Sequence, residues 1–411
     1  MTTAVDDRPA VLKTRITGVD AARGIALVGM AAVHIYPLVT DDGDQTWAWA
    51  LFAGKAAALF ALLAGVSLAF TSGGRNPSTD GWVRSSAAAG VAARALVVAA
   101  VGLLVGSLVS DPYVILPYYG VMFLLAVPVL FAPTRVLLFL AVISALVVPF
   151  VMQALREWLP FPFLDNPSVL DAVTDPWRLV TSLVLTGVYP ALPWMAYLCL
   201  GLVIGRCDLR DTRVARRLLG WGLVLAVVPI LVSNFLLYVL GGYDQLLATP
   251  GFSEEGVDDV IGWGPDPVLP TFTNWWLTIP AAHSSTPVDL VHTAGVAVAV
   301  LGAVLLLEKL PGVPRLLAPL AAAGGLTLTF YTTQVLLTGT GFGMDHPDAL
   351  FLGQVVLGLV LAVLWRRLRG QGPLERVVSW CAHRARDTVL RSRDAAAAGA
   401  RDSTGGVGSG R

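Results

Sequence analysis

The segment "GVDAARGIALVGMAAVH", residues 18–34, carries an acid, a base and an imidazole inside an apolar run. On an α-helix that turns about 100° per residue, Asp20, Arg23 and His34 fall within one stripe about 60° wide. Arg23 and His34 are separated by about 16 Å along the helix axis. Ionisable side chains inside a membrane span cost free energy and usually face a cavity or one another. The shared stripe therefore favours a polar cavity along this helix.

Simpler interpretations of these residues remain open. Asp20 and Arg23 are three residues apart, so they can form an ion pair at the membrane boundary, or Arg23 can extend its side chain to water. His34 can be a hydrogen-bonded histidine in helix packing. Four polar side chains of "GGLTLTFYTTQ", residues 324–334, similarly either join packed helices or line a tunnel.

Two further segments place polar side chains in apolar surroundings. Lys55 lies eight residues inside the run "WAWALFAGKAAALFALLAGVSLAF", at a depth similar to that of His34. Its ammonium either extends outward to water or binds an anionic group or an acyl carbonyl. The segment "PAAHSSTPVDL" places His283 beside three hydroxyl residues. Thr286 and Pro287 match helix N-capping chemistry, and His283 is a second candidate for a catalytic base.

The composition indicates a membrane protein. Of 411 residues, 55% are hydrophobic and 14% are charged, whereas soluble domains carry roughly 25% charged residues. The formal net charge is zero, so no basic field points to a nucleic-acid partner. Cys199, Cys207 and Cys381 show neither paired nor histidine-flanked spacing, so neither a metal site nor a disulfide framework is expected.

Apolar runs of sufficient length predict an all-α, polytopic membrane protein with about ten spans. The sixth run is long and is interrupted by Pro190 and Pro193, so eleven hydrophobic helices result if it is divided. The ten runs lie at 17–39, 48–71, 87–109, 113–131, 135–153, 179–206, 218–240, 289–307, 316–340 and 349–365.

The charges of the loops predict that both termini are cytoplasmic. In this orientation, Arg156 and Arg178 are the only cations in the outer loops, which hold most of the acids. The location expected from this pattern is the plasma membrane.

The sequence predicts five segments along the chain. They are a cytoplasmic tail (1–15), an N-terminal bundle with a catalytic first span (16–240), an extracytoplasmic loop or lid (241–288), a C-terminal bundle (289–370), and a cytoplasmic tail (371–411) that is amphipathic and then disordered from residue 395.

Several segments resemble the transmembrane acyltransferases. "RITGVDAARGIALVGMAAVH" is similar to the first span of relatives of heparan-alpha-glucosaminide N-acetyltransferase, of YeiB-like bacterial membrane proteins and of the acyltransferase-three family. The shared features are an Asp, an "RG" three residues later and an apolar run. "LFALLAGVSLAF", "YPALPWMAYLCLGLVIGR", "GGLTLTFYTTQ" and "GPLERVVSW" resemble later segments of this group, in order, so the resemblance covers roughly residues 15–380.

The resemblance implies transfer of an acyl group, foremost acetyl, from acetyl-CoA or another acyl-CoA donor. The acceptor would be a hydroxyl or amine of a sugar, glycan, lipid or other molecule of the bacterial cell envelope, outside the membrane. In the acyltransferase-three group, a histidine eleven residues after the "RG" arginine is essential, and His34 holds that position here. The heparan-type enzymes usually carry Asn there and place their catalytic histidine in the first outer loop. That loop reads "TDDGDQTWAW" in this chain and holds no histidine.

The residues of the stripe suit this chemistry. Arg23 would bind the donor's phosphates at the inner boundary, and Asp20 would orient its guanidinium. The thioester arm would pass Leu27 and Ala31 on its way to His34. A neutral imidazole there would take a proton from the acceptor, or would accept the acyl group itself.

The remaining residues and rival functions complete the prediction. Lys55 would stabilise the oxyanion that forms during transfer, and His283 is the alternative catalytic base.

No tightly bound cofactor is implied; the partners are the bilayer, the acyl-CoA and the acceptor. A transporter or flippase could use the same charges as a binding site and proton relay, and a structural or sensory role is a weaker option. Acceptor, acyl chain length and oligomeric state, including a homodimer, stay open.

Overall fold

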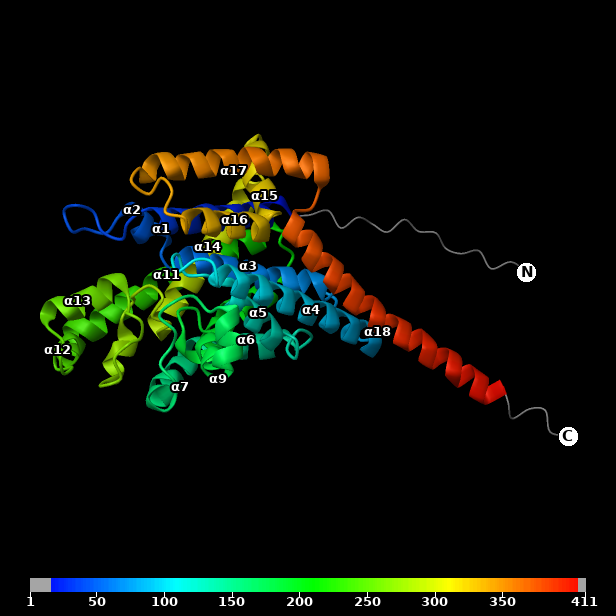
Figure 1. Ribbon diagram of the computed structural model, residues 1–411, viewed down its shortest axis with the longest axis horizontal. Coiled ribbons are helices and arrows are strands. Elements are labelled where there is room, and N and C mark those ends of the chain that lie inside the picture. The colour runs from blue at the N-terminus through cyan, green and yellow to red at the C-terminus, as the bar shows by residue number, and fades with distance from the viewer. Residues whose placement is uncertain (1–15, 406–411) are drawn as a thin grey trace.

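The computed structural model describes residues 16–405, with side chains described through residue 394 (Figure 1). Every regular element in this range is a helix. Six helices are long and apolar enough to cross a membrane, and up to nine crossings result if each of three bent helix pairs counts as one. The chain is therefore an all-helical, multi-pass membrane protein.

The difference between nine candidate crossings and the predicted ten lies in residues 113–131. This stretch forms α5 (Leu116–Ala126), an 11-residue helix that is followed by a turn. About 20 helical residues are needed to cross the hydrocarbon core, so α5 alone is too short. An apolar run shows only that a segment is buried, because membrane lipid and protein interior are similarly apolar.

The remaining elements follow the predicted runs closely. The long helices are α1 (Thr17–Ile35), α2 with α3 (Trp47–Phe52 and Lys55–Thr71), α4 (Gly81–Gly106), α11 with η3 (Thr212–Asn234 and Phe235–Val239), α14 (Pro287–Leu307) and α17 (Pro347–Arg369). The bent pairs are α6 (Thr134–Leu146) with α7 (Val148–Leu155), α9 (Pro176–Thr181) with α10 (Ala191–Gly205), and α15 (Val313–Gly324) with α16 (Thr327–Thr338).

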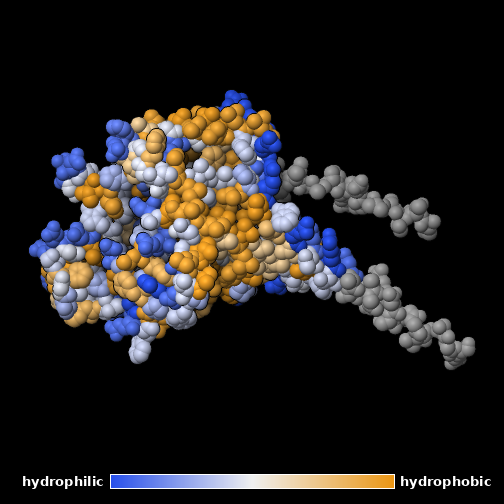
Figure 2. Space-filling view, in the orientation of Figure 1, coloured by the Kyte–Doolittle hydropathy of each residue, from blue (hydrophilic) through white to orange (hydrophobic). Residues whose placement is uncertain are grey.

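The surface has an apolar band between two polar ends. Figure 2 shows hydrophobic residues gathered across the middle of the molecule, with hydrophilic residues at either side. The start of α1 and the long helix α18 (Pro373–Gly405) lie at one end, which we call the inner end (Figure 1). At the opposite, outer end lie α12 (Gly242–Leu247) and α13 (Glu254–Trp263).

The two tail predictions have different outcomes. Residues 1–15, predicted as a cytoplasmic tail, lie outside the described residues. At the other end, α18 continues to Gly405, so the prediction of disorder is wrong for residues 395–405. The alanine-rich stretch there favours helix, because alanine has the highest intrinsic helix propensity. Residues 406–411 again lie outside the described range.

The stretch 241–288 forms a small folded unit at the outer end. It contains α12, α13 and η4 (Asn274–Thr278), which pack around the fully buried Trp276. The indole N–H of Trp276 donates a hydrogen bond to Thr249 Oγ1 at 3.0 Å. Gln45 and Trp49, near the start of α2, both donate to the carbonyl oxygen of Gly262, so this unit is joined to the first helices.

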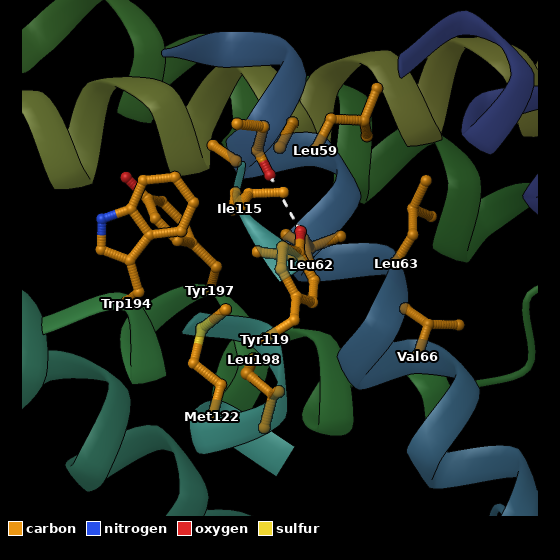
Figure 3. Close-up of a cluster of buried hydrophobic side chains, with 14 of the residues drawn as sticks. Leu59, Leu62, Leu63, Val66, Ile115, Tyr119, Met122, Trp194, Tyr197 and Leu198 are labelled. Carbon is orange, nitrogen blue, oxygen red and sulfur yellow. Dashed lines mark hydrogen bonds between the residues drawn. The ribbon is translucent and has the colours of Figure 1, made fainter. Parts of the chain in front are cut away.

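The main core joins α3, α5 and α10. Figure 3 shows Tyr119 among leucines of α3, and its hydroxyl donates a hydrogen bond to the carbonyl oxygen of Ala57 at 3.3 Å. Tyr197 of α10 shares a 2.7 Å hydrogen bond with Thr293 of α14. Buried tyrosine hydroxyls that find partners in this way give an apolar core a defined arrangement.

Two glycines set the close crossing of α1 and α15, which positions Asp20 and Arg23. A Cβ added at Gly24 would lie 2.2 Å from the carbonyl oxygen of Leu320, and one at Gly324 would lie 1.8 Å from that of Asp20. Both neighbours are backbone atoms, so a larger residue forces the helices apart. Because α1 carries the polar stripe, this crossing fixes where the stripe lies in the bundle.

Replacement of Gly324 by valine is therefore expected to destabilise the protein by at least about 1–3 kcal/mol, the usual range for overpacking. Thermal unfolding of the purified protein in detergent measures this effect. Gly220→Val on α11 is the matched control, since a Cβ there meets nothing within 4 Å. Equal unfolding temperatures for the two variants would contradict the close-crossing argument.

Candidate functional site

A cavity of about 520 Å³ lies among α1, α3, α4, α5, α16 and the start of α18; we call it the inner cavity. Its volume is within the range of roughly 300–1,000 Å³ that is typical of small-molecule sites. One part of the wall is apolar, and the other carries charged and hydroxyl side chains. The apolar part includes Phe60, Val98, Leu116 and Phe123, and the polar part includes Asp20, Arg23, Ser67, Arg94 and Glu375.

The first part of the polar stripe faces this cavity. Arg23 donates a 2.6 Å hydrogen bond to Asp20 Oδ1 and a second hydrogen bond to Ser67 Oγ of α3. Ser67 in turn donates to the carbonyl oxygen of Leu63 at 2.6 Å. The ion pair considered in the sequence analysis is therefore present, and it borders the inner cavity. These contacts hold the Arg23 guanidinium in one orientation.

Arg94 of α4 also lines the inner cavity, and the sequence analysis missed it. Within the part of the chain that the structure describes, Arg94 forms no hydrogen bond or ion pair. Its charge interacts with those of Arg23, Arg386 and Glu375. The signal was available, because an ionisable residue inside a predicted span is a functional candidate by default. Two guanidinium groups on one cavity wall have the chemistry that suits an anionic ligand.

Glu375 joins α18 to the wall of the inner cavity. Its carboxylate accepts hydrogen bonds from the N–H groups of Leu328 and Thr329, at 2.7 and 3.1 Å, and from the hydroxyl of Thr329 at 2.6 Å. These N–H groups belong to the first turn of α16, where an acid is favourable for both capping and the helix dipole. The α18 helix thereby fixes the start of α16.

A second, much smaller cavity of about 30 Å³ contains both histidines of the sequence prediction. His34 comes from the last turn of α1, and His283 from the loop before α14. Tyr189 and Tyr331 complete part of its wall. We call it the histidine cavity. The fold thus brings together two residues that the sequence offered as alternatives.

The hydrogen bonds of His34 define which ring nitrogen is free. Its Nδ1 lies 3.0 Å from Gln334 Oε1 on α16, and the Nε2 of the same amide donates to Thr338 Oγ1 at 2.9 Å. An amide oxygen only accepts, so Nδ1 of His34 carries the hydrogen. The lone pair of the neutral ring is then on Nε2, where it is available as a base.

His283 is held in a strained and desolvated position. Its backbone φ is +60°, a left-handed value that non-glycine residues seldom adopt. The ring packs edge-on against Tyr189, with 5.2 Å between the centroids. Its Nδ1 is buried without a hydrogen-bond partner among the described residues. Burial, followed by the charges at His34 and Lys55, lowers the pKa of His283 to about 4, so this imidazole is neutral at physiological pH.

Lys55 lies near this cavity without lining it or the inner cavity, as far as residues 16–394 show. The helix is interrupted at Gly54, whose φ is +69°, so Lys55 is the first residue of α3 inside the candidate span Trp47–Thr71. Its Nζ donates a 2.9 Å hydrogen bond to the carbonyl oxygen of Ala50. Its charge also interacts with that of Asp289 at the start of α14. Its role in binding an acyl carbonyl stays a prediction.

Tyr331 lies between the two cavities. It lines both of them and is almost fully buried, and its hydroxyl accepts a 3.1 Å hydrogen bond from the N–H of Ile115. Arg23 and His34, expected along one passage, line two separate cavities that share this residue. Tyr331 lies on α16, which follows a 71° bend after α15.

The middle of the polar stripe borders a third cavity. Leu27 and Ala31, expected along the donor's route, line a space of about 80 Å³ among α1, α16 and α17, which we call the side cavity. Tyr331 and Gln334 belong to its wall as well. Three cavities thus share the side chain of Tyr331.

A comparison with protein families gives one match. A family model described as heparan-alpha-glucosaminide N-acetyltransferase, catalytic, matches residues 15–234, more than half of the chain. No curated protein matched the chain. The match confirms the resemblance found in the sequence and extends from α1 through α11. Asp20, Arg23, His34, Lys55 and Arg94 lie within it, whereas His283, Tyr331, Gln334 and Glu375 lie beyond it.

Proposed function

Because this chain belongs to the heparan-alpha-glucosaminide N-acetyltransferase catalytic family, we propose that it transfers an acyl group from a cytoplasmic acyl-CoA-type donor to an acceptor outside the plasma membrane. The acceptor group is a hydroxyl or amine of a sugar or another envelope molecule. The single observation that carries this proposal is the arrangement of the inner cavity and the histidine cavity on either side of Tyr331.

The inner cavity suits a donor that has an anionic end and an uncharged arm. Arg23 and Arg94 would bind phosphate oxygens by charge-assisted hydrogen bonds. The apolar wall, which includes Val98 and Phe123, would contact the arm that carries the thioester. Binding of an anion would also relieve the electrostatic repulsion between the two guanidinium groups.

The histidine cavity suits the transfer step. Nε2 of His34 takes the proton as the acceptor's hydroxyl or amine attacks the thioester carbonyl carbon. The new C–O or C–N bond forms, the C–S bond breaks, and the leaving thiolate takes the proton from the imidazolium. His283, neutral and on the outer side, either orients the acceptor or serves as the base itself. An acyl-histidine intermediate would divide the same change into two steps.

Tyr331 must move for the thioester to meet His34. In this structure the tyrosine hydroxyl accepts a hydrogen bond from the N–H of Ile115, and Tyr331 borders both cavities. Rotation of the side chain would open the route while a donor is bound. Closure of the same route without donor would keep ions and water from crossing the membrane.

A transporter is the second candidate, and one observation favours it. Transport proteins often contain broken helices near the middle of the membrane, and this chain has three bent helix pairs. A transporter would use the cavities on both sides of Tyr331 as alternately exposed binding sites. Such a protein would need no acyl donor.

Purified protein in sealed vesicles distinguishes the two functions. Acetyl-CoA labelled in its acetyl group is supplied on the side of the inner end, and a glucosaminide, the acceptor class in the family's name, is supplied on the other side. Acyl transfer predicts labelled product on the acceptor side and free thiol on the donor side, without an ion gradient. Gradient-dependent uptake of solute with intact acetyl-CoA would establish the transporter instead.

A further inference from the structure

The side cavity is an apolar space beside the proposed reaction centre. Its wall combines Leu27 and Ala31 of α1, Phe330 of α16, and Val355 and Gly358 of α17. The amide of Gln334 also borders it, but both ends of that amide are engaged, with His34 and with Thr338. Apart from the Nε2 of Gln354, which has no hydrogen-bond partner among the described residues, the wall offers few polar groups, so the space is suited to hydrocarbon.

The arrangement of the three cavities matches the three directions of a thioester. A thioester carbonyl carbon has the sulfur and its carrier on one side, the acyl chain on another, and a face open to the attacking nucleophile. Tyr331 borders the inner cavity, the side cavity and the histidine cavity. A carbonyl that replaces the tyrosine hydroxyl would therefore have its carrier, chain and nucleophile each in a separate space.

We propose that the side cavity binds the acyl chain of the donor, and that the preferred donor carries a chain longer than acetyl. This inference rests on the proposed acyl transfer and specifies its substrate class. A cavity needs roughly 10–15 Å³ of internal volume for each group of the size of a water molecule. At about 80 Å³, the side cavity holds a chain of about five to eight carbons.

An unpaired amide supports a ligand in this space. Gln354 of α17 lines the side cavity, and its Nε2 is buried without a hydrogen-bond partner among the described residues. A buried donor of this kind is costly unless something accepts from it. The carbonyl oxygen of a bound acyl group is an acceptor that would enter together with its chain.

Narrowing the side cavity tests the proposal. Gly358 lines it, and a Cβ there would make ordinary contact with Phe330 at 3.7 Å, so a larger side chain fits in the helix and fills the space. Gly353, on the same helix, is the matched control, because a Cβ there meets nothing within 4 Å. Purified wild type, Gly358→Leu and Gly353→Leu are assayed with acetyl-, butyryl-, hexanoyl- and octanoyl-CoA under identical conditions.

For the wild type we expect a kcat/KM with hexanoyl- or octanoyl-CoA about tenfold or more above that with acetyl-CoA. Gly358→Leu is expected to lower the hexanoyl-to-acetyl ratio by about tenfold or more, whereas Gly353→Leu keeps the wild-type ratio. Val355→Phe provides a second narrowing variant if Gly358→Leu does not fold.

Two results would overturn the inference. One is a wild-type preference for acetyl that both narrowing variants retain. The other is an unchanged ratio together with a phospholipid that copurifies with wild type and is lost in Gly358→Leu, which would assign the cavity to a membrane lipid. Absence of transfer from every donor by the wild type would instead overturn the proposed function itself, and the inference with it.

Discussion

Replacement of His34 by alanine is expected to reduce acyl transfer by about 100- to 10,000-fold, the usual contribution of a general base. Nδ1 of His34 is hydrogen-bonded to Gln334, which leaves Nε2 as the nitrogen that can accept a proton. The alanine variant removes this proton acceptor. Donor affinity is expected to stay near the wild-type value, because His34 lines the histidine cavity and the arginines line the inner cavity. Single-turnover transfer and equilibrium binding of a non-reactive thioether analogue measure the two quantities separately.

His292 provides the matched control for this variant. It lies on α14, and its Nδ1 is 2.7 Å from the carbonyl oxygen of Ala226. His292→Ala therefore removes a span histidine with a structural contact and is expected to leave the transfer rate within a few-fold of wild type. Full transfer by His34→Ala, combined with loss in His283→Ala, would contradict the assignment and make His283 the base.

The sequence could predict much of the inner part of the site from one helix. Helical periodicity alone places Asp20, Arg23 and His34 on one face, and the structure puts the first two on the inner cavity and the third on the histidine cavity. The positions of the membrane spans are also predictable, because they depend on the local hydropathy of the sequence. Hydropathy did not predict that the run 113–131 contains only the short helix α5, because a buried apolar helix and a membrane-spanning helix have the same composition.

The rest of the site depends on contacts between distant segments. Nothing local in "PAAHSSTPVDL" shows that His283 reaches the cavity of His34. Tyr331 comes from α16, which follows a 71° bend after α15, and the sequence shows only a glycine pair at that bend. Leu27 and Ala31 are expected along the donor's route from their positions on one helix, but they line the side cavity. The sequence of one helix does not show which neighbouring helices its residues face.

Arg94→Met is the second variant with a large expected effect. The loss of one charge-assisted contact is expected to cost about 1.5–3 kcal/mol of donor binding, which is about 10- to 100-fold in the dissociation constant. Titration of purified protein with an acyl-CoA thioether analogue measures this change. Arg84→Met on the same helix is the control, because the Arg84 guanidinium stacks on Phe131 at 4.8 Å, away from the inner cavity.

The same variant separates a binding role from a structural one. A partly buried guanidinium without a partner among the described residues, close to a second arginine, destabilises the protein in the absence of donor. Arg94→Met is therefore expected to unfold at the same or a higher temperature than wild type when no donor is present. Addition of the analogue should raise the unfolding temperature of wild type and Arg84→Met, and raise that of Arg94→Met much less. A lower unfolding temperature for Arg94→Met, with unchanged donor affinity, would show that Arg94 supports the fold and that another group binds the donor's phosphates.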